Sequence, residues 1–66
     1  MTVKNKIKQL ECCGWKLRDV ARFNDNRKSV NYIFTSGDEW RVVMYTENNV
    51  IKKIDVVYLG IEQLPF

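Results

Sequence analysis

The sequence contains no histidine, and only one proline, three glycines and two cysteines among its 66 residues. Without histidine, a Ser-His or Cys-His nucleophile pair cannot form, and a zinc site with an imidazole ligand is excluded as well. The cysteines, Cys12 and Cys13, are adjacent and too few for a four-thiolate zinc site. A disulfide between neighbours would be strained and would close almost no loop. We therefore expect two free thiols in a reducing, cytoplasmic compartment.

Long apolar runs are also missing. No run approaches the ~20 residues of a membrane-spanning helix. The lysines near the N-terminus are not followed by an apolar segment, so no secretory signal is expected. Hydrophobic residues make up 45% and charged residues 29% of the chain, which is a globular composition. The length predicts one small domain over residues 1–66.

The charge balance is only mildly basic. There are 11 Lys and Arg against 8 Asp and Glu, which gives a net charge of +3. A protein dedicated to nucleic acid usually concentrates basic side chains on one face, so this small surplus alone carries little weight.

Residues 2–13 have the pattern of an amphipathic helix. An apolar stripe recurs at helical spacing and consists of Val3, Ile7 and Leu10. Thr2 is a suitable N-cap, and Gly14 stands where a left-handed residue ends a helix. Cys13 lies at the edge of the stripe and Cys12 opposite it, so Cys13 is expected to be the more buried thiol.

From Trp15 onward the apolar period changes to two, which is typical of strands. Four strands are predicted, at residues 15–23, 29–35, 39–46 and 50–58. The turn signals between them are Asn24-Asp25-Asn26, Ser36-Gly37-Asp38 and Asn48-Asn49. Short turns join antiparallel neighbours, so the fold class is α+β: an N-terminal helix packed on a four-stranded antiparallel β-meander. An apolar C-terminal tail follows Gly60.

Both faces of this sheet carry large apolar side chains. In the second strand one face carries Val30, Tyr32 and Phe34, and the other face carries Ile33. In the third strand one face carries Trp40, Val42 and Met44, and the other carries Val43 and Tyr45. In the fourth strand one face carries Ile54, Val56 and Tyr58, and the other carries Ile51 and Val57. One helix covers one face. The remaining apolar side chains are either an ordinary scatter of exposed residues or a surface that is covered in one of three ways: by curling of the sheet into a barrel, by the tail, or by a second chain, either a copy or a partner.

Nothing in the sequence suggests catalysis. Most acidic residues fall at turns or at exposed strand positions, and neighbours such as Asp38 and Glu39 point to opposite faces of a strand. They do not converge as an acid and base pair. Gly37 is a lone turn glycine, so no phosphate-binding loop is present. We expect no enzyme activity, no cofactor and no metal.

Protein binding is the function we expect. Six asparagines with many lysines and isoleucines are typical of a low-GC genome, which suggests a bacterial, phage or mobile-element origin. Small proteins of this kind often act by contact through a sheet face or edge. The mixture of aromatic and arginine side chains that forms binding hot spots is available at Trp40, Arg41 and Tyr45. We therefore expect a small regulatory or interaction protein that binds a protein partner or a copy of itself.

Nucleic-acid binding is the alternative. Lys16, Arg18 and Arg22 share one parity of the first predicted strand and would form a basic stripe on one face. Exposed aromatic side chains nearby could stack on bases.

Overall fold

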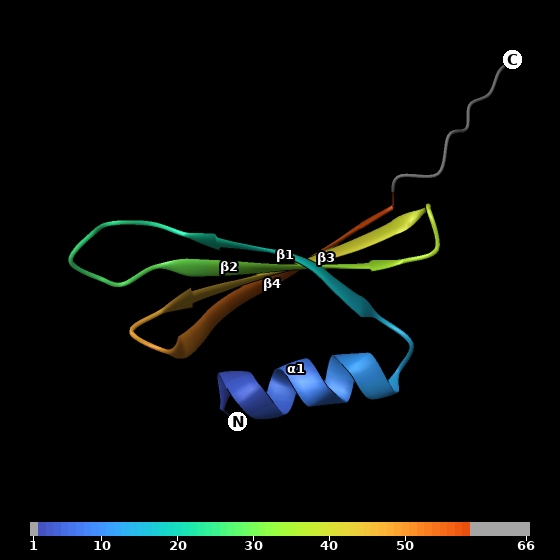
Figure 1. The fold of residues 1–66 in the computed structure, drawn as a ribbon, viewed down its shortest axis with the longest axis horizontal. Helices are drawn as coiled ribbons and strands as arrows, with labels where there is room; N and C mark the ends of the chain where they lie inside the picture. Colours follow the sequence, from blue (N-terminus) through green and yellow to red (C-terminus); the bar gives the residue numbers. More distant parts are fainter. Residues whose placement is uncertain (1, 59–66) are drawn as a thin grey trace, which may run out of the picture.

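The computed structural model of the protein describes residues 2–58 and confirms the predicted order of elements. The elements are α1 (Val3–Cys12), β1 (Lys16–Arg22), β2 (Val30–Ser36), β3 (Trp40–Glu47) and β4 (Val50–Tyr58). The strands form one antiparallel sheet in the order β1-β2-β3-β4, and α1 runs along one side of it (Figure 1). The predicted apolar tail lies outside the described residues. No helix among residues 2–58 is long and apolar enough to span a membrane.

Both ends of α1 form as the sequence predicts. The Thr2 hydroxyl accepts a hydrogen bond from the Asn5 backbone N–H at 3.1 Å, which satisfies one of the free donors of the first turn. At the other end, Gly14 has φ +95°, and its N–H donates to the Glu11 carbonyl at 3.1 Å. The next N–H, of Trp15, donates to the Leu10 carbonyl at 3.0 Å, which completes a Schellman motif.

The apolar stripe of α1 faces the sheet. Val3 is buried, and Ile7 and Leu10 pack against the core. Cys12 and Cys13 are both free, as expected, and both are exposed, so the expected burial of Cys13 does not occur. Both residues lie at the C-terminal end of the helix, Cys12 as its last residue and Cys13 as its C-cap.

The core is small and lies where α1 meets β2 and β3. Its buried hydrophobic side chains are Val3, Phe34, Val42 and Met44, and those of Phe34 and Met44 are fully buried. The pairing of β2 with β3 is regular, so Phe34 opposes Val42 and Tyr32 opposes Met44 on the face that α1 covers. Hereafter this face is the inner face, and the other is the outer face. Thr46 is also buried on the inner face, and its hydroxyl donates to the Val30 carbonyl at 2.8 Å.

Two irregularities change which residues share a face. The register of β1 on β2 shifts between Leu17 and Asp19, and that of β4 on β3 shifts by one residue at Lys52. A β-bulge inserts one unpaired residue and so reverses the parity beyond it. The second bulge corrects the sequence prediction for Ile51: it pairs with Thr46 and packs on the core, on the same face as Ile54.

The turns use residues that tolerate a left-handed backbone. Asn48 and Asn49 have φ +50° and +63° and join β3 to β4 with two residues, as a type I′ turn requires. Gly37, at φ +62°, lies in the three-residue loop between β2 and β3.

The core position of Phe34 generates a stability prediction. F34A removes a fully buried ring and should lower the free energy of unfolding by ~3–5 kcal/mol, which is most of what a small domain has. F23A, at a phenylalanine that is 50% exposed, should cost less than ~1 kcal/mol. Urea unfolding followed by far-UV circular dichroism measures both. Equal losses would contradict the assigned core.

Candidate functional site

The largest exposed apolar area of the inner face lies on β4 and the start of β3. It consists of Trp40, Ile54, Val56 and Tyr58, and we call it the β4 surface. Register places all four side chains on the inner face, since Val42 opposes Val56 and Met44 opposes Ile54. Their exposed fractions are 42%, 37%, 60% and 54%, respectively. These residues follow the core pattern but lie beyond the part of the sheet that α1 covers.

The position of the helix explains this exposure. Among the strands, α1 lies closest to β1. Figure 1 shows that the C-terminal end of β4 and the turn between β2 and β3 lie away from α1. The far end of the inner face therefore has no helix against it.

At one end of the β4 surface the side chains of Trp40 and Tyr58 contact each other. They are directly opposed across β3 and β4, and their ring centroids are 4.6 Å apart at an interplanar angle of 47°. Such tilted aromatic pairs contribute roughly 0.5–1.5 kcal/mol beyond the burial of area. The contact holds two large side chains in a fixed arrangement while roughly half of each stays exposed.

The β4 surface borders an open sheet edge. In the described part of the chain β4 has one neighbour, β3, so its other side carries unpaired backbone N–H and C=O groups. An edge strand with exposed apolar side chains beside it is the arrangement that accepts an added strand.

The residues predicted to bind a partner do not form one cluster. Trp40 lies on the inner face, while Arg41 and Tyr45 lie on the outer face opposite Thr35 and Asn31. Arg41 is exposed and Tyr45 is half-buried. Only Trp40 belongs to the β4 surface.

Sequence reasoning missed the other members of that surface. The alternation of Ile54, Val56 and Tyr58 was visible, and it assigned them correctly to one face. What the alternation does not reveal is how far the helix reaches across that face.

The predicted basic stripe is also divided, because the first bulge reverses the parity of β1. Lys16 pairs with Thr35 on the outer face, and the Arg18 Nε donates to the Thr35 hydroxyl at 3.0 Å on that same face. Arg22 pairs with Val30 and therefore lies on the inner face. The prediction that all three share a face was wrong.

The register gathers a different group of cations instead. Thr35 is paired with Lys16 on one side and with Arg41 on the other, and Arg18 donates to its hydroxyl. We call Lys16, Arg18 and Arg41 the outer cationic group. They come from β1 and β3, so no local pattern in the sequence joins them.

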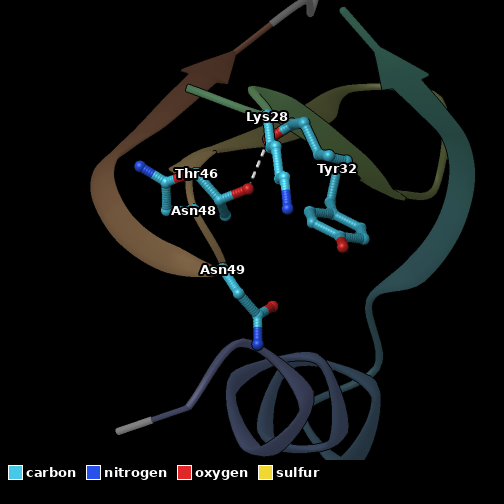
Figure 2. A pocket seen from close by; sticks show the side chains of 6 residues that line it. Lys28, Tyr32, Thr46, Asn48 and Asn49 are labelled. Carbon is cyan, nitrogen blue, oxygen red and sulfur yellow. Dashed lines mark hydrogen bonds between the residues drawn. The ribbon is translucent and has the colours of Figure 1, made fainter. Parts of the chain in front are cut away.

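A cavity of about 320 Å³ opens on the inner face near the β3–β4 turn. It is lined by Lys28, Val30, Tyr32, Thr46, Asn48 and Asn49. Figure 2 shows Lys28 and Tyr32 among the side chains around the cavity, and Asn49 directed toward the helix. The volume is at the lower end for small-molecule sites, and no carboxylate lines it. The cavity therefore offers hydrogen bonds and one positive charge, but no acid and base pair.

The loop that carries Lys28 is ordered by Asp25. One carboxylate oxygen accepts from the backbone N–H groups of Ser29 and Arg27, both at 3.1 Å, and the other accepts from the Ser29 hydroxyl at 2.9 Å. The Lys28 N–H donates to the Asp25 carbonyl at 3.3 Å, and Lys28 has φ +51°. Arg27 forms an exposed ion pair with Glu47 at 3.5 Å.

The hydrogen bonds from Ser29, first from its backbone N–H and then from its hydroxyl, lower the pKa of the Asp25 carboxyl below its ordinary value. Within residues 2–58, no group of three or more Cys, Asp or Glu side chains is placed to hold a metal ion.

Comparisons with known proteins give no match: no family model, no curated protein and no solved structure corresponds to this chain.

The Asp25 network predicts a pH-dependent stability. A carboxyl whose pKa is depressed in the folded state stabilises it above the pKa of the unfolded chain, and this contribution is lost as pH falls through the folded pKa. D25N should therefore be less stable than the wild type at neutral pH, and the difference should shrink below about pH 4. Urea unfolding at a series of pH values measures it. A difference that stays constant down to low pH would contradict this role for Asp25.

Proposed function

We propose that this chain is a small, non-enzymatic protein-binding module that acts through the β4 surface and the adjoining edge of β4. The observation that carries the proposal is the exposure of Trp40, Ile54, Val56 and Tyr58 on and beside β4, an edge strand with no second neighbour among residues 2–58. Apolar and aromatic side chains in one patch are the features of interaction sites, and Trp and Tyr are the residues most enriched in binding hot spots.

The two cysteines indicate the cellular compartment. Cys12 and Cys13 are free and exposed thiols, which persist in a reducing environment. We propose a cytoplasmic protein, and the bacterial, phage or mobile-element origin remains a prediction from composition.

A partner strand would gain two kinds of contact here. Its backbone would pair with the free N–H and C=O groups of β4, as in other cases of strand addition. Its side chains on the inner side would cover Val56 and Tyr58, the most exposed members of the β4 surface. Burial of apolar area makes this interaction only weakly dependent on salt, in contrast to one that neutralises phosphates.

W40A tests the proposal. Trp40 is 42% exposed, so its truncation should cost no more than ~2 kcal/mol of folding stability, well below the loss expected for F34A. Binding should weaken by about tenfold or more, as for a hot-spot aromatic residue. A protein retained by the immobilised chain would be purified and titrated by calorimetry against wild type, W40A and F23A. Equal affinity for wild type and W40A would contradict the proposal, and F23A is the control for loss of an exposed aromatic side chain elsewhere.

The outer cationic group favours nucleic-acid binding as the second candidate. Three positive side chains lie around Thr35 on a face that also carries Tyr45. Compared with the predicted basic stripe, this group contains Arg41 in place of Arg22.

The double variant R18E/R41E tests this candidate. If the outer cationic group binds phosphates, the variant should lose most of its affinity for labelled RNA or DNA, and wild-type affinity should fall steeply with salt. R22E, on the inner face, is the control and should bind as the wild type does. Fluorescence anisotropy measures all three, and equal affinities for R18E/R41E and R22E would exclude the outer group.

A further inference from the structure

The outer side of β4 carries a short alternating charge pattern. Lys53 and Asp55 lie on the outer face opposite Tyr45 and Val43, and Ile54 lies between them on the inner face. The Lys53 ammonium is 3.5 Å from the Asp55 carboxylate and 5.7 Å from the centre of the Tyr45 ring. Both charged side chains are more than a third exposed, so they remain open to a strand that pairs with β4.

We infer that the occupant of this edge is a second copy of the chain. Its β4 pairs antiparallel with the first β4 about a two-fold axis at Ile54. The inference rests on the proposed function and names the partner for the same edge. The axis places Ile54 opposite Ile54 of the second copy, and Lys53 of each copy opposite Asp55 of the other. The result is one eight-stranded sheet with both helices on the same face.

Charge complementarity argues for a copy rather than for an arbitrary strand. A lysine on an edge strand normally discourages pairing, because it is costly to oppose or to bury. A strand added here must present an acid opposite Lys53 and a base opposite Asp55. The antiparallel copy meets both requirements at once. The four charges then alternate in sign along each strand and across the axis.

The same charges select the register. An axis at Lys53 would set lysine against lysine, and an axis at Asp55 would set carboxylate against carboxylate, which is destabilising for directly opposed residues. An axis at Val56 would set Asp55 against Val57 of the copy and leave the carboxylate without a cross-strand partner. Only the axis at Ile54 gives two favourable pairs. The bulge at Lys52 lies outside these three central pairs.

Burial of apolar side chains would stabilise the dimer, and the ion pairs would select its register. Ile54 and Val56 lie on the inner face at 37% and 60% exposure. In the proposed dimer Ile54 meets its equivalent on the axis, and Val56 becomes the diagonal neighbour of Ile54 of the copy. Two members of the β4 surface are thereby covered by the same pairing that satisfies the backbone of the edge.

Charge reversal tests the inference by sedimentation velocity over a range of concentrations. The wild type should dimerise. K53D and D55K should each weaken the dimer about tenfold to a hundredfold, because two symmetric contacts change from attractive to repulsive. K53D/D55K should restore it. K52D makes the same change of charge one residue away, in the bulge, and is the matched control.

An equimolar mixture of K53D and D55K chains gives the sharpest result. Each chain alone should be largely monomeric, and the mixture should form a heterodimer, since every opposed pair is then of opposite sign. Both chains remain net positive, so long-range attraction cannot account for the association. Far-UV circular dichroism should show that every variant keeps the wild-type fold, as expected for side chains that are more than a third exposed.

Three results would overturn the inference: a wild type that is monomeric at every concentration, a K52D effect as large as that of K53D, or no association in the mixture. None of them would remove the proposed function. If the chain is monomeric but W40A still weakens binding to a different protein, the β4 surface binds that protein and the copy is the wrong occupant. If W40A has no effect on binding either, both proposals fail.

Discussion

A single short helix has to cover the inner face of a four-stranded sheet. At 1.5 Å per residue, the ten residues of α1 extend over about 15 Å, whereas the nine residues of β4 extend over about 30 Å. Four strands side by side give the sheet a width of nearly 20 Å. The helix can therefore exclude water from only part of that face. The core forms beneath it, around Phe34 and Met44, and side chains with the same orientation farther along β3 and β4 stay exposed.

This mismatch explains why the inner face has two different regions. Next to the helix, Val3 and Val42 are almost completely buried. Toward the C-terminal end of β4, Val56 and Tyr58 follow the same alternation but keep more than half of their surface in water. A small domain buries little apolar area and is only marginally stable, so an uncovered row of apolar side chains means a considerable loss of stabilising free energy. Association through this row would recover part of that loss, which connects the fold to the function proposed for it.

Local chemistry made much of the fold predictable. The Thr2 cap, the stop at Gly14 and the Asn48-Asn49 turn each depend on a residue type that suits one backbone conformation, and all three form as expected. The bulges were not predictable in this way. A bulge is fixed by pairing between strands, so reading β1 by alternation alone placed Arg22 with Lys16 when the two lie on opposite faces. The β4 surface was missed for a related reason, since its exposure depends on where α1 lies, and no single strand carries that information.

We infer that the edge of β4 that has no neighbour among residues 2–58 is a binding edge. Amide hydrogen exchange resolved by residue, at low and high protein concentration, tests it most directly. If β4 is the binding edge, amides of β4 around Ile54 exchange more slowly at high concentration, while those of β1, the other edge strand, exchange at the same rate at both concentrations. Exchange at β4 that is as fast as at β1, and independent of concentration, would show that β4 is not a binding edge.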